Sequence, residues 1–102
     1  MSTEPMLEVR IESQDPNLIA EIESTLAQVN AKRGEKTRDF VTVLAIAASA
    51  VKLINALLEL KQRLEDKPDG SKVYVLNANR DQMVLPEATE RKLSELIESA
   101  DS

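Results

Sequence analysis

The chain has 102 residues, a formal net charge of −5, and neither cysteine nor histidine. This length suits one domain, which we expect to span residues 1–102 with an ordered core from about 7 to 98 and flexible ends at 1–5 and 99–102. The acidic balance argues against a general nucleic-acid binder. Without histidine or cysteine the usual nucleophile–base pairs and zinc, copper or iron sites cannot be built, so we expect no catalytic residues, no cofactor and no metal.

The first third of the chain predicts a strand followed by a helix. Leu7, Val9 and Ile11 alternate with charged residues, which is typical of a half-buried strand. Asp15 followed by Pro16 is a helix start, and apolar residues then recur at spacings of three and four, which predicts a helix that ends near Gly34.

The most apolar part of the chain, FVTVLAIAASAVKLINALLEL, contains neither proline nor glycine. We expect a second helix over residues 40–64, capped by Asp39 or by Thr37. A membrane span is not expected, because Lys52 would lie close to the middle of the bilayer.

The last third predicts a hairpin and a closing helix. The segments 72–78 and 83–85 are rich in β-branched and apolar residues and are separated by a turn. Pro86 ends the second strand and opens a helix with an apolar stripe. The expected fold is therefore α+β with the order β-α-α-β-β-α, a small three-stranded sheet and helices packed mainly on one face.

The predicted helix 40–64 is apolar over more than half of its circumference, which is more than one small sheet can cover. Its remaining side is lined mostly by small residues at three- and four-residue spacing, Ala45, Ala48, Ser49, Lys52 and Ala56. These five residues are a hypothetical partner-binding or self-association face. The alternative is that the alanines only favour the helix at its solvent boundary.

The segment KRGEKTR places Lys32, Arg33, Lys36 and Arg38 around one glutamate. We consider it a candidate patch for an anion or an acidic partner, or else a solvated loop. It lacks the interleaved aromatic residues of single-stranded nucleic-acid sites. Strand edges are a further candidate, since an extended segment of another chain can add to a free edge.

LEVRIES is followed by an amphipathic helix, by an apolar helix ending in ALLELKQRL, by the hairpin VYVLNANRDQMVLPEA and by a short closing helix. This layout resembles the effector-associated constant component 1 family of small bacterial proteins. The resemblance implies an accessory protein of a bacterial defence or conflict system that acts through protein contacts, with an effector such as a caspase-like peptidase or an NTPase as partner. Many relatives carry a longer link with an extra strand before the apolar helix, whereas the link here is only NAKRGEKTR, which leaves strand number and order open.

We therefore expect a non-enzymatic adaptor or regulator that forms homo-oligomers or docks on an effector through residues 40–64. The alternative is an antitoxin-like inhibitor whose acidic surface covers a basic site of a toxic enzyme. A membrane-associated accessory protein is a third reading. The lack of cysteine and of a secretory signal predicts a cytoplasmic location.

Overall fold

The computed structural model describes residues 5–37 and 39–101. Those parts form an α+β fold with a five-stranded antiparallel sheet and three helices. The strands are β1 (Met6–Ile11), β2 (Asn30–Lys36), β3 (Val41–Ile46), β4 (Val73–Leu76) and β5 (Gln82–Val84). The helices are α1 (Pro16–Leu26), α2 (Ala50–Leu64) and α3 (Glu90–Asp101), with short 3-10 turns at Pro68–Lys72 and Leu85–Glu87.

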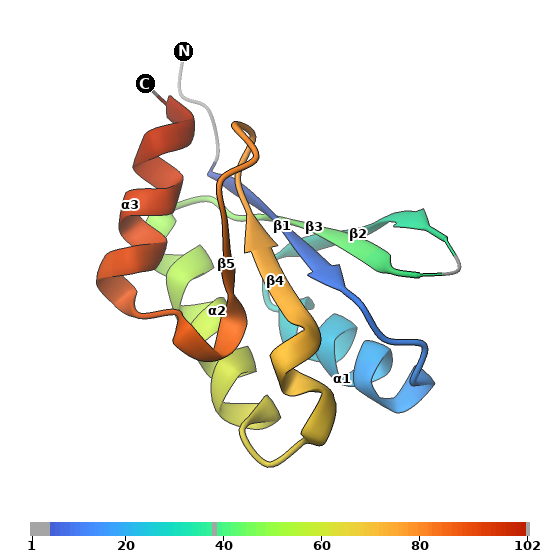
Figure 1. Ribbon diagram of the computed structural model, residues 1–102. Coiled ribbons are helices and arrows are strands. Elements are labelled where there is room, and N and C mark those ends of the chain that lie inside the picture. The colour runs from blue at the N-terminus through green and yellow to red at the C-terminus, as the bar shows by residue number, and fades with distance from the viewer. Residues whose placement is uncertain (1–4, 38, 102) are drawn as a thin grey trace.

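The sheet order is β2-β3-β1-β4-β5, so β1 is central and β2 and β5 are the edges. Figure 1 shows α1 and α2 behind the sheet and α3 beside β5. α2 packs between α1 and α3. We call the helix-covered side of the sheet the inner face and the opposite side the outer face.

The inner face is built by strict alternation along the strands. Val9 pairs with Val43 on one side and with Val75 on the other, and all three side chains are almost completely buried. They share one core cluster with apolar residues of the helices, among them Ile22 of α1 and Leu57 of α2. Because this cluster is filled by aliphatic side chains at close packing, the core needs no aromatic residue.

The predicted helix 40–64 is wrong for its first ten residues, which form β3 and the turn before α2. The start of β3 is the β-branched run of residues 41–43, which favours a strand. α2 begins only at Ala50, because the Ser49 side chain caps it by accepting from the Lys52 N–H at 3.3 Å.

The predicted caps Asp39 and Thr37 do not begin a helix. The Thr37 hydroxyl accepts from the backbone amides of Asp39 and Phe40, both at 3.2 Å. These bonds stabilise the turn between β2 and β3, so the capping chemistry is present but belongs to a hairpin.

The prediction of three strands is also wrong. The helix expected to run to Gly34 ends at Leu26, and residues 30–36 form β2 against β3. The polar sequence of β2 has little strand propensity of its own, so its pairing with β3 decides its conformation. The first strand, the Asp15 cap and the hairpin of β4 and β5 lie close to where the sequence predicts them. The last helix is present but begins at Glu90 and not at Pro86, because Leu85, Pro86 and Glu87 form a 3-10 turn.

The predicted flexible ends are only partly within the structure. Residues 1–4 and residue 102 lie outside the described part of the chain. α3 continues to Asp101, beyond the expected core limit at residue 98.

Candidate functional site

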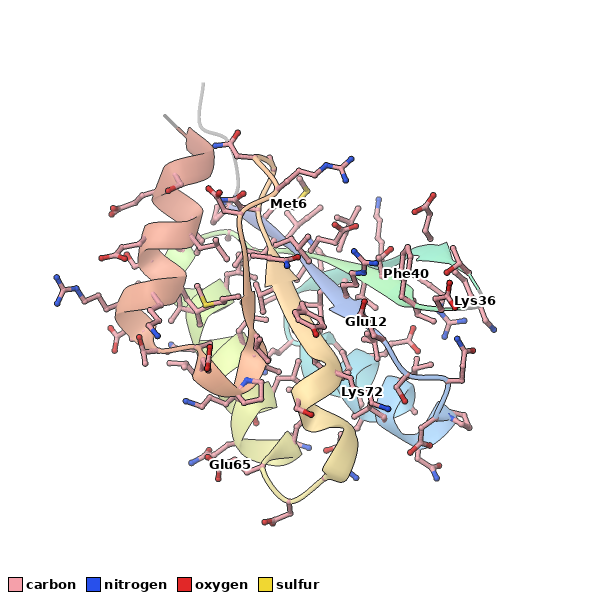
Figure 2. All side chains as sticks on the ribbon, viewed as in Figure 1. Met6, Glu12, Lys36, Phe40, Glu65 and Lys72 are labelled. Carbon is pink, nitrogen blue, oxygen red and sulfur yellow. The ribbon has the colours of Figure 1, made fainter. Side chains whose placement is uncertain are left out.

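No helix covers the outer face of the sheet in the described part of the chain, and several apolar side chains lie on it. Alternation places these residues there: Met6, Glu8, Arg10, Thr42, Leu44, Ile46, Tyr74 and Leu76. Met6 is 41% exposed, and Leu44, Ile46 and Tyr74 are half-buried. Figure 2 shows Met6 and Phe40 toward opposite ends of this face. The face therefore combines apolar side chains with a few charges, as the buried centre of a protein interface does.

Arg10 is held in place on this face by an aromatic ring. Its guanidinium carbon lies 4.1 Å from the centroid of the Phe40 ring, and Nη2 lies 3.5 Å from the Glu12 carboxylate. The Nε atom is buried and finds no hydrogen-bond partner among the described residues. The rest of the guanidinium remains about one-third exposed and can bond to water or to a partner.

An open hollow of about 310 Å³ lies on the outer face around Arg10. Its lining includes Met6, Glu8, Arg10, Glu35, Phe40, Thr42, Leu44, Leu76, Asn77, Ala78 and Arg80. Two carboxylates and two guanidinium groups thus share the lining with apolar side chains such as Leu44 and Leu76. The hollow can accept a side chain or loop of a protein partner that carries both charged and apolar groups.

The turn between β4 and β5 carries Arg80 to the rim of this hollow. Arg80 has a φ of 71°, a left-handed conformation that glycine or asparagine adopts more easily. Asn77 fixes the turn, because its Oδ1 accepts from the N–H groups of Asn79 at 2.9 Å and Asp81 at 3.0 Å. Its Nδ2 donates to the carbonyl of Leu96 in α3 at 2.9 Å, which ties the turn to the last helix.

A β-bulge in β2 shapes the opposite rim. The register shifts between Arg33 and Lys36, and the Thr42 hydroxyl bonds to the bulged backbone. This hydroxyl accepts from the Glu35 N–H at 2.7 Å and lies 3.3 Å from the Glu35 carbonyl, to which it donates. A Cβ on Gly34 would lie 2.5 Å from the same oxygen, so a larger residue there would force the Thr42 side chain to move.

The five residues of the predicted partner-binding face do not share one side of a helix. Ala45 lies on β3 and Ala56 on α2, and both are completely buried in the core. Ala48 and Ser49 lie in the turn before α2, and Lys52 is exposed in its first turn. Only the segment 48–52 is therefore accessible, and partner binding there stays a prediction.

The predicted basic patch lies on the free edge of the sheet. Lys32, Arg33 and Lys36 are exposed on β2, whereas Arg38 lies outside the described residues. Arg33 pairs with Glu23 of α1 at 2.7 Å, and this hydrogen-bonded carboxylate raises the pKa of Arg33 above its ordinary value. The patch is thus an edge strand and not a loop, and anion or partner binding by it stays a prediction.

The outer face and the hollow are the features that the sequence reasoning missed. Two signals pointed to them: the β-branched run of Val41, Thr42 and Val43, and the cap at Ser49. Within residues 5–37 and 39–101, no three carboxylates lie together in a way that could hold a metal ion. No helix in the same ranges is long and apolar enough to cross a membrane.

Comparisons of the chain with protein-family models, with curated proteins and with solved structures found no match. The resemblance to effector-associated constant component 1 stays a prediction. The candidate site therefore rests on the geometry of this chain.

Proposed function

We propose that the protein is a non-enzymatic protein-interaction module that self-associates through the outer face of its sheet. The observation that carries this proposal is the sheet itself, which has helices on one face and exposed or half-buried apolar side chains on the other. Covering Met6, Leu44 and Ile46 with a second surface would remove further apolar area from water.

A second copy of the chain is the partner that the charges favour. The hollow carries Glu8 and Glu35 together with Arg10 and Arg80, so it has no excess of either sign. A two-fold axis lets the carboxylates of one copy face the guanidinium groups of the other. With a net charge of −5, the chain as a whole carries an acidic excess that repels a second copy, which makes this balanced face the favourable place of contact.

The size of the face indicates a weak dimer. Strands of three to seven residues, about 4.8 Å apart and with a rise of about 3.3 Å per residue, give the sheet a face of about 400 Å², which is below the roughly 800 Å² per partner of a standard interface. We expect dissociation in the micromolar range. An adaptor with such an affinity assembles when its local concentration rises, for example on an effector.

The family resemblance adds the biological setting to this proposal. In that setting the protein is an accessory component of a bacterial defence or conflict system, and its dimer presents two equal surfaces to an effector such as a caspase-like peptidase or an NTPase.

Sedimentation equilibrium from about 1 µM to about 1 mM tests self-association. We expect the wild type to dimerise and Leu44→Glu to remain monomeric, because the substitution replaces an apolar contact of each copy with a charged group that must lose its water. Val51→Glu is the matched control, since Val51 is 66% exposed on α2, away from the outer face. A monomeric wild type, or a dimer broken by Val51→Glu and not by Leu44→Glu, would contradict the proposal.

An inhibitor of a toxic enzyme is the second candidate function. Glu87, Glu90, Glu95 and Glu98 are exposed on and just before α3, although Glu95 pairs with Arg91 at 3.5 Å. Such a row suits a basic site on another protein. Binding of a partner that weakens steeply with salt and is unaffected by Leu44→Glu would favour this candidate over the adaptor.

A further inference from the structure

We propose that the free edge of β2 binds an extended acidic segment of a partner protein as a sixth strand of the sheet. This inference rests on the proposed function only in assuming an interaction module, and it concerns the free edge of the sheet, which borders the outer face at Lys32. Three features support strand addition at β2: its unpaired backbone groups, its basic side chains and the hollow beside it.

β2 is an edge strand in the order β2-β3-β1-β4-β5. One side of it pairs with β3 from Asn30 to Arg33, and alternate residues of an antiparallel edge strand direct their N–H and C=O groups away from that partner. The bulge then turns both backbone groups of Glu35 to the Thr42 side chain. The stretch available to an added strand is therefore the part before the bulge, residues 30–33.

The charges of β2 select the partner. Lys32, Arg33 and Lys36 are exposed on the strand, within a chain that is acidic overall. Two β2 strands of separate copies would bring these cations together, which opposes edge-to-edge pairing. The same cations attract glutamate or aspartate on an incoming strand. They therefore disfavour the β2 strand of a second copy and favour an acidic segment of another protein.

An open hollow of about 610 Å³ borders the same strand. Its lining includes Ala27 and Val29 between α1 and β2, Ala31 on β2, and Val43 on β3. These side chains are small or aliphatic, and the rest of the lining is Ile46 with the polar residues Glu23, Asn30, Lys32 and Arg33. An edge that is merely protected by lysine needs no such hollow, whereas an added strand has alternate side chains that must be buried on the inner side. The geometry thus fits a segment that alternates apolar and acidic residues.

Arg33 shows how an incoming carboxylate would be received. Its guanidinium already donates two hydrogen bonds to the carboxylate of Glu23, at 2.7 Å from Nη2 and 3.3 Å from Nε. Lys32 and Lys36 have no carboxylate within ion-pair distance among the described residues. Lys32 lies within the free stretch 30–33, so we assign the principal electrostatic contact to it. Lys36 lies beyond the bulge and adds attraction at longer range, and Arg33 positions the edge.

The probe is a fluorescent ten-residue peptide that alternates valine with glutamate, titrated with the full chain at low salt. We expect the wild type to bind it and Lys32→Glu with Lys36→Glu to bind at least about tenfold more weakly. The matched control, Lys67→Glu with Lys92→Glu, changes the net charge equally at exposed positions away from β2 and should bind within about twofold of the wild type.

Backbone pairing is tested by a second peptide of the same sequence that is N-methylated at alternate residues. It keeps its charges but cannot form the ladder, and we expect it not to bind. Amide signals of residues 30–33 should shift with the unmodified peptide. No binding to the wild type, equal binding of the methylated peptide, or equal weakening in both double variants would overturn the inference.

Variants of each surface distinguish peptide binding at the β2 edge from self-association through the outer face. Met6→Glu, on β1 of the outer face and two strands away from β2, should bind the acidic peptide as the wild type does while remaining monomeric. Lys36→Glu, opposite the inner-face residue Val41, should dimerise as the wild type does. Loss of peptide binding in Met6→Glu would overturn an independent edge site, whereas a monomeric wild type that binds the peptide would contradict only the proposed self-association.

Discussion

The two faces of the sheet differ more than their sequences suggest, and the neighbouring residues Val43 and Leu44 show how. Val43 is 1% exposed on the inner face and belongs to the main core cluster. Leu44 is half-buried on the outer face and lines the hollow around Arg10. Both are aliphatic, but only the first is needed to hold helices on the sheet. The apolar side chains of the outer face are therefore the ones that the proposed self-association would cover.

The largest expected effect comes from placing a charge on each face in turn. Val43→Glu should destabilise the fold by about 4 kcal/mol or more, because it buries an unpaired carboxylate in the core. Leu44→Glu should change the free energy of unfolding of the monomer by less than about 1 kcal/mol. Urea unfolding followed by circular dichroism measures both. Equal destabilisation would mean that the two faces are equally part of the core.

The second-largest change in stability is expected at the β-bulge in β2. Gly34→Ala should destabilise the protein by about 1–3 kcal/mol, because the new methyl group overlaps the Thr42 hydroxyl. Ser24→Ala is the control, since Ser24 is exposed on α1. Thr42→Ala should remove most of the added cost of Gly34→Ala in a double-mutant cycle. Additive costs would show that the two residues do not meet.

Arg80, at the rim of the outer-face hollow, is expected to lower the stability of the monomer while strengthening self-association. Arg80→Gly should stabilise the monomer by up to about 1 kcal/mol, because glycine adopts the left-handed conformation without the cost of a Cβ. The same change should weaken self-association, since it removes a guanidinium from the outer face. Thermal unfolding and sedimentation measure the two effects. Weakened self-association in Arg91→Gly, on exposed α3, would contradict a specific role for Arg80.

The smallest change in stability is expected at Glu59, on the exposed side of α2. Hydrogen bonds from Gln28 and Arg63 lower the pKa of Glu59. Its contribution to stability is therefore complete above the pKa of an ordinary glutamate, about 4.3, and is lost as the pH falls through the lower pKa of the folded state.

Glu59→Gln should therefore be slightly less stable than the wild type at pH 7, and the difference should shrink toward pH 3. Unfolding by urea at several pH values measures it, with Glu65→Gln, which is exposed beyond the end of α2, as the control. A difference that grows toward low pH would contradict the direction of the shift.

Elements with a clear local signal could be predicted from the sequence. The alternation from Leu7 to Ile11, the cap at Asp15 and the paired strands before Pro86 each fix their own structure. Those elements place the central strand, the first helix start and the hairpin. They leave the position of the other strands undetermined.

The sequence did not predict β2 and β3, for two physical reasons. The apolar run from Phe40 to Leu60 is buried both as strand and as helix, so its hydrophobicity conceals the change of period at Ser49. The polar segment Asn30–Lys36 becomes a strand only because β3 is there to pair with it. The outer face depends on both of these strands, and it could not be recognised before they were placed.

Intermolecular contacts in a mixed sample test the central claim most directly. Isotope-filtered NOE spectra of a 1:1 mixture of labelled and unlabelled protein, at a concentration above the dissociation constant, detect methyl groups that touch the other copy. We predict contacts from the methyl groups of Met6, Leu44 and Ile46. Contacts from Val51 and Leu58 of α2 in their place, or no intermolecular contacts at millimolar concentration, would contradict self-association through the outer face.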